Sequence, residues 1–167
     1  MFQLVPTILT LTLALTYPPP LHFQPIEDET KQHKGHAVVD IRSDVGWIGS
    51  AQQFNMIVQI TPDSGWHVYW KNPGSSGAPT KFEVEAPAGF TVGEPVFPRP
   101  MTFQGNEGQT YGYDSAAAIF IPVTAPDHIQ DGQLEITVTT SWLACKKSCV
   151  MGEQTNTLTL GANSLHQ

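Results

Sequence analysis

Short runs of alternating apolar and polar side chains, separated by turn residues, recur along the chain from Ala37 onward. The clearest is the run 133–142, in which the two faces differ in character. One face carries Leu134, Ile136, Val138 and Trp142, and the other carries Glu135, Thr137, Thr139 and Ser141. A period of two residues over this length is that of a β-strand with one buried face.

The same period appears in other runs and predicts an all-β fold. These runs are 38–41, 53–60, 66–70, 81–85, 116–123 and 155–160. Turn signals such as Asp63-Ser64-Gly65 and Asp131-Gly132 divide them, and 14 glycines with 14 prolines favour turns over long helices. Strands of this number and spacing are typical of an immunoglobulin-like β-sandwich, which we expect over residues 37–162.

The acidic charge of the chain excludes one class of partner. The 167 residues carry a formal charge of −7 at neutral pH and contain only 8 Lys and Arg. Contact with phosphates needs clustered cations, so we expect no binding of nucleic acid. The apolar content of 40% is enough for one hydrophobic core.

The N-terminal segment has the character of an export signal. From Met1 to Ile26 there is no charged side chain, and the mostly apolar run ends at Thr16. This run is too short for a comfortable membrane span but fits the apolar region of a signal peptide, which we place at residues 1–16. An uncleaved anchor and a mis-started reading frame are the alternatives.

A linker is expected to join this segment to the sandwich. Residues 17–36 contain Pro18-Pro19-Pro20, which favours an extended chain, and a polar run follows. His33 and His36 lie in this linker without further metal ligands nearby, so we interpret both as solvated side chains of a tail.

The two cysteines of the chain, Cys145 and Cys149, both follow the most regular strand. In an exported protein such a pair is expected to form a disulfide. Closing a loop of five residues stabilises a fold by only roughly 2 kcal/mol in the chain-entropy model, against roughly 4 kcal/mol for a bridge spanning about 60 residues. A disulfide with this spacing would therefore stabilise the fold only weakly. The bridge is either a structural disulfide of this weak kind or a reactive one.

Two lysines between the sulfurs favour the reactive interpretation. Lys146 and Lys147 are adjacent in an otherwise acidic chain, and nearby cations favour a thiolate, the species that attacks in disulfide exchange. Such exchange needs no cofactor. The alternative is a non-catalytic sandwich that binds a protein partner or copper, with a structural disulfide; two soft sulfur ligands suffice for a linear copper(I) site.

Three blocks of sequence resemble the N-terminal periplasmic domain of DsbD-type thiol:disulfide interchange proteins, in particular the ScsB-like branch. The blocks are Gly65 to Gly74 with Gly77 and Pro79; Tyr111 to Tyr113 with Ile119 to Val123; and Trp142 to Cys145 with Cys149 and Gly152. The resemblance covers about residues 37–160. It implies an immunoglobulin-like fold with redox cysteines at one end and an exported, periplasmic location.

The resemblance also implies roles for individual residues. Cys149 matches the cysteine that forms mixed disulfides with partners, and Cys145 matches the resolving cysteine. The stretch Phe97 to Gly105 matches a cap loop, with Phe103 as the residue that shields the pair, and Tyr69 is expected to hydrogen-bond near the cysteines or simply to pack. We interpret His67, its neighbour on the same strand face, as a surface side chain, with proton donation to the leaving thiolate as the alternative.

In that family the domain is a protein-disulfide reductase component. It takes electrons from a thioredoxin-like domain or a membrane electron carrier, which allows a position near the membrane, and it passes them to oxidised exported proteins. This chain carries neither of those donor parts, so we expect them on separate proteins, unless the chain is a fragment or a degenerate copy.

Overall fold

The computed structural model describes residues 34–105 and 107–164. The expected signal peptide at 1–16 lies outside the described residues, as do His33 and most of the expected linker. Within the described part of the chain, no helix has the length and apolar character of a membrane span.

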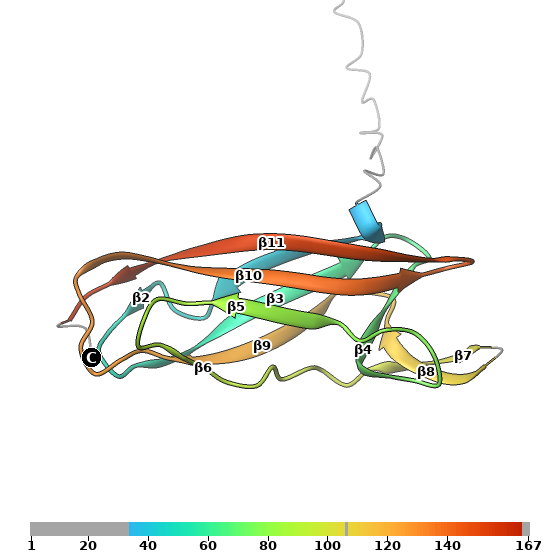
Figure 1. The fold of residues 1–167 in the computed structure, drawn as a ribbon, viewed down its shortest axis with the longest axis horizontal. Coiled ribbons are helices and arrows are strands. Elements are labelled where there is room, and N and C mark those ends of the chain that lie inside the picture. The colour runs from blue at the N-terminus through green and yellow to red at the C-terminus, as the bar shows by residue number, and fades with distance from the viewer. Residues whose placement is uncertain (1–33, 106, 165–167) are drawn as a thin grey trace, which may run out of the picture. The chain divides into compact units, whose positions relative to one another are not determined.

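Two mainly antiparallel sheets form a β-sandwich, which confirms the predicted fold class (Figure 1). The first sheet has the order β1 (Ala37–Ser43), β3 (Gln53–Pro62), β9 (Ala117–Thr124) and β6 (Thr91–Val92). The second has the order β2 (Trp47–Ile48), β11 (Cys149–Ala162), β10 (Gly132–Cys145), β4 (His67–Gly74), β8 (Gly108–Tyr113) and β7 (Met101–Gly105), and β5 (Lys81–Glu85) pairs with β10.

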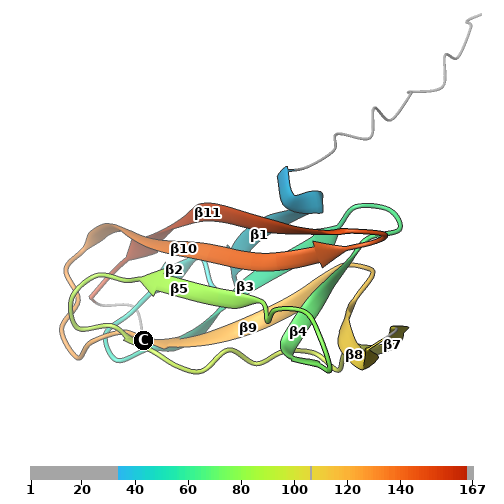
Figure 2. The ribbon, with the colours of Figure 1, turned by 45° about the vertical axis from the view of Figure 1, so that its right-hand side comes forward.

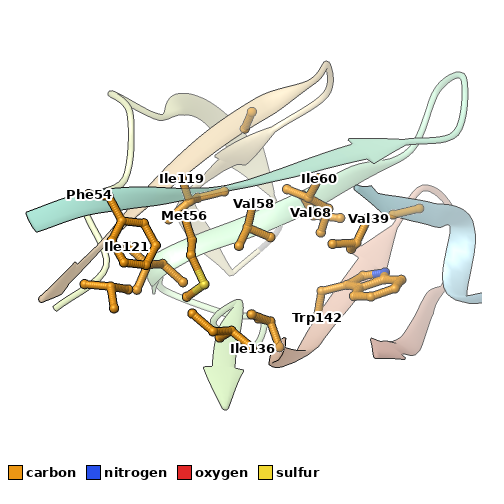
Figure 3. Close-up of a cluster of buried hydrophobic side chains, with 14 of the residues drawn as sticks. Val39, Phe54, Met56, Val58, Ile60, Val68, Ile119, Ile121, Ile136 and Trp142 are labelled. Atoms are coloured by element: carbon orange, nitrogen blue, oxygen red, sulfur yellow. The ribbon is translucent and has the colours of Figure 1, made fainter. Parts of the chain in front are cut away.

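The alternation in the sequence places the core between the sheets. The inward residues of β3 and β9 are buried, and those of β10 from Ile136 to Ala144 are buried as well. Figure 3 shows Trp142 of β10 lying near Val39 and Val68, which come from strands of the two different sheets. On the outer face of the β10–β11 pair, Thr139 and Thr155 stand opposite each other with their hydroxyl oxygens 2.9 Å apart. Such cross-strand pairs help to fix the register of the hairpin.

The folded part begins earlier than the sequence indicates. A short 3-10 helix, η1 (Lys34–His36), occupies the last residues of the predicted linker. The indole N–H of Trp142 donates a hydrogen bond of 2.8 Å to the buried carbonyl of Gly35. The interpretation of His36 as a solvated tail residue is wrong, because its ring stacks on Trp66 with 3.5 Å between centroids and its Nδ1 lies 3.2 Å from Asp63.

Four strands have no counterpart among the predicted runs. The strands β2 and β6 have two residues each, too short to show a period. The hairpin of β7 and β8 is rich in Gly, Gln and Thr, and the residues of β7 are mostly exposed, so no alternation is visible. Figures 1 and 2 place this hairpin and β4 at the same end of the sandwich as the turn between β10 and β11.

Candidate functional site

The cysteine pair closes the β10–β11 hairpin. Cys145 is the last residue of β10, Cys149 is the first of β11, and the two stand opposite each other in the antiparallel register. The Lys146 N–H donates to the Ser148 carbonyl at 3.1 Å, which tightens the turn. The Cα atoms of the two cysteines are 4.2 Å apart, and their sulfurs are joined in a disulfide. The bridge therefore connects two residues that the hairpin already holds together.

The two cysteines differ in their access to solvent. Cys145 is 4% exposed, whereas Cys149 is exposed at the start of the edge-proximal strand β11. A thiolate that approached from solvent would therefore meet Cys149 first. Cys145 would then be the leaving group, because breaking the bond transfers the electron pair to the other sulfur.

Tyr69 provides a hydrogen-bond donor to the sulfur of the buried Cys145. Its hydroxyl donates to Cys145 Sγ at 3.4 Å, and the side chain is 5% exposed. The Thr80 hydroxyl donates to the Tyr69 carbonyl at 2.6 Å and holds the strand in place. Burial raises the pKa of the Tyr69 hydroxyl, and the negative charge of Glu107 raises it further. The hydroxyl therefore keeps its proton and can stabilise a thiolate on Cys145.

His67 stands beside the pair, where the sequence placed only a surface histidine. It is the direct antiparallel partner of Cys145 in β4 and is half-buried. Its ring stacks on Phe103 with 4.6 Å between centroids and meets the edge of Tyr69 at 5.2 Å. Burial lowers the pKa of His67, opposed by the nearby charge of Asp114. The interpretation of His67 as a surface side chain is therefore wrong.

The remaining predicted residues occupy the rim of the site. Phe103 of β7 is half-buried and lies over the ring of His67. Lys146 and Lys147 are exposed in the turn, and the Lys146 ammonium donates to the Ser64 carbonyl at 3.3 Å. Among the residues that the structure describes, no three His, Cys, Asp or Glu side chains cluster as a metal site would require.

The fold and this site together define a class of protein: an immunoglobulin-like domain for thiol–disulfide exchange, with a cysteine pair at one end. The profile of a family described as "Thiol:disulfide interchange protein DsbD, N-terminal" matches residues 37–161. The chain belongs to this family.

A solved structure with the same fold is that of ScsB. The N-terminal periplasmic domain of ScsB from Proteus mirabilis matches with a TM-score of 0.57 and 20% identity over 74% of this chain, which spans 46% of that one. The reduced N-terminal domain of DsbD from Neisseria meningitidis matches with a TM-score of 0.45 and 14% identity, covering 69% of this chain and 82% of that one. Among curated proteins, none matches this chain.

Proposed function

We propose that the domain relays reducing equivalents from a thioredoxin-like or membrane electron donor to oxidised exported proteins. The observation that carries this proposal is the asymmetric bridge, in which Cys149 faces solvent and Cys145 is buried against a hydrogen-bond donor. A bridge with one reachable sulfur and one stabilised leaving group is suited to opening and closing. Export is supported by the disulfide itself, because such bonds persist in oxidising compartments.

Reduction of the domain begins at the exposed sulfur. A donor thiolate attacks Cys149 Sγ, a bond forms between the donor sulfur and Cys149, and the electron pair of the broken bond goes to Cys145 Sγ. The hydroxyl of Tyr69 supports this thiolate until it is protonated. A second thiol of the donor attacks the donor sulfur of the mixed disulfide. The donor leaves oxidised, and Cys149 is released as a thiolate.

Delivery to a client uses the same sulfurs in the opposite direction. The Cys149 thiolate attacks a client disulfide, one client sulfur leaves as a thiolate and takes up a proton, and a mixed disulfide forms. Cys145 then attacks Cys149 Sγ, the bridge closes, and the second client sulfur leaves. The client gains two electrons, and the domain loses two. Lys146 and Lys147 favour the thiolate form of the pair through their positive charge.

A transfer assay with cysteine variants tests the relay. The oxidised domain is mixed with a reduced thioredoxin-like donor, and a disulfide-bonded client is added. We expect Cys149→Ser to abolish transfer and Cys145→Ser to accumulate a mixed disulfide with the client, visible as a higher-mass band without reductant. Normal electron transfer by both variants contradicts the proposal and favours a structural staple.

A further inference from the structure

The residue that pairs with Cys145 on β4 offers a structural basis for the unequal exposure of the two cysteines. Cys145 pairs directly with His67 of β4, and on one face of an antiparallel sheet the Cβ atoms of such a pair lie about 4.5–5.5 Å apart. The ring of His67 thus borders the flank of Cys145 that faces β4. Cys149, by contrast, pairs with Cys145 itself at the hairpin end and is exposed.

The ring of His67 is itself packed against a second aromatic ring. Phe103 covers it at a centroid distance of 4.6 Å with 20° between the ring planes. Phe103 belongs to β7, which is separated from β4 by β8 in the sheet order, so the β7–β8 hairpin brings it back over β4. The strand β8 of this hairpin is anchored, because the Ser75 N–H donates to the Gln109 carbonyl at 2.9 Å.

We propose that His67 is a positioning residue that directs incoming thiols to Cys149. Its ring, backed by Phe103, closes the approach to the Cys145 sulfur from the β4 side. The inference rests on the proposed exchange function of the pair and adds the residue that makes Cys149 the sulfur that is attacked.

The direction of attack decides where the electron pair of the broken bond goes. Attack on Cys149 leaves the thiolate on Cys145, where the hydroxyl of Tyr69 donates to it. Attack on Cys145 forms the new bond at a buried sulfur and leaves the thiolate on Cys149, away from that hydroxyl. Covering Cys145 therefore favours the productive direction of attack. The incoming thiol reacts at Cys149, and the thiolate is left on Cys145, where it is stabilised.

Alkylation of the reduced full chain measures the approach to each sulfur. Iodoacetamide is the probe, and trypsin cleavage after Lys146 and Lys147 places the two cysteines in separate peptides for mass spectrometry. We expect Cys149 to react at least about tenfold faster than Cys145, whose burial limits access to its thiolate. In His67→Ala the rate at Cys145 should rise about tenfold with little change at Cys149, and His67→Phe should restore the original selectivity because it keeps the ring.

Matched variants keep the test decisive. His128→Ala removes an exposed histidine in the loop before β10 and should leave the selectivity unchanged. If circular dichroism shows that His67→Ala does not fold, Phe103→Ala opens the same stack from its other side and should raise the rate at Cys145. Unchanged selectivity in the folded variants overturns the inference. It is also overturned if the alkylation rates of His67→Phe equal those of His67→Ala, because the effect would then belong to the imidazole group and not to the bulk of the ring. Selectivity that is lost in His67→Ala and restored in His67→Phe supports the inference even if the chain never reduces a protein client, a result that would overturn only the proposed relay.

Discussion

The hydroxyl of Tyr69 and the sulfur of Cys145 meet at 3.4 Å although 76 positions separate the two residues in the sequence. The contact joins β4 to the end of β10, and both side chains are buried. It gives the buried half of the disulfide a hydrogen-bond donor at the atom where negative charge develops when the bridge opens.

Removing that donor should slow the opening of the bridge. In Tyr69→Phe the Cys145 thiolate loses a hydrogen bond to a charged group, worth about 1.5–3 kcal/mol, so reduction by a small thiol should slow by about tenfold or more. Stopped-flow kinetics under excess dithiothreitol measures the rate. The control is Tyr111→Phe, whose hydroxyl bonds the exposed Gln109 side chain instead. Equal rates of reduction for Tyr69→Phe and the unaltered chain would show that the Tyr69 hydroxyl does not assist the opening of the disulfide.

The loop that packs against the Tyr69 ring contains Gly77, and a side chain at this position should destabilise the fold. Gly77 has a φ of 96°, and a Cβ at this position would overlap the Tyr69 ring. We expect Gly77→Ala to lower the free energy of unfolding by about 1–3 kcal/mol through backbone strain and overlap. Urea denaturation measures the loss. Gly46→Ala is the matched control, because a Cβ there meets nothing within 4 Å; similar effects of both substitutions would refute the packing argument.

The anchor between the N-terminal helix and the second sheet should contribute to stability. Trp142→Phe keeps an aromatic ring in the core but removes the N–H that bonds the buried Gly35 carbonyl. An unsatisfied buried acceptor costs about 1–3 kcal/mol, so the urea midpoint should fall accordingly. Trp47→Phe, at an exposed tryptophan, should change the midpoint little. A midpoint unaffected by Trp142→Phe would show that the hydrogen bond contributes nothing.

The protonation state of His67 should make the free energy of unfolding depend on pH in the acid range. Burial lowers the pKa of this imidazole in the folded protein relative to its unfolded value of about 6.5. Its contribution is therefore fully present above that unfolded pKa and is lost as the pH falls through the folded pKa, because the unfolded chain binds the proton more readily. Between pH 8 and pH 5 the unaltered chain should lose stability relative to His67→Phe, measured by urea denaturation of both proteins. A constant difference across this range contradicts the assignment.

Most strands of the sandwich and the position of the cysteine pair after the most regular strand can be predicted from the sequence. Strands such as β3 and β10 carry one buried face, so their period of two is visible in the residues themselves. The β7–β8 hairpin was missed as strands because its outward residues are polar or glycine and its position depends on contacts with the loop at Ser75.

The surroundings of the bridge were less predictable than the bridge. The place of His67 depends on its register with Cys145 and on Phe103 folding back from β7, and neither is encoded in the residues next to it. Likewise, the helix η1 follows a proline-rich segment and is fixed by the distant Trp142. Long-range pairing of this kind leaves no local pattern in a single sequence.

The reduction potential of the Cys145–Cys149 couple tests the central claim most directly. Equilibration of the full chain with glutathione buffers, followed by thiol trapping and mass spectrometry, gives the value. A bridge that opens and closes in exchange should have a potential between about −270 and −120 mV, the range of thioredoxin-like exchange proteins. A value below about −300 mV, typical of permanent structural disulfides, would contradict the account and leave the domain as a non-catalytic sandwich.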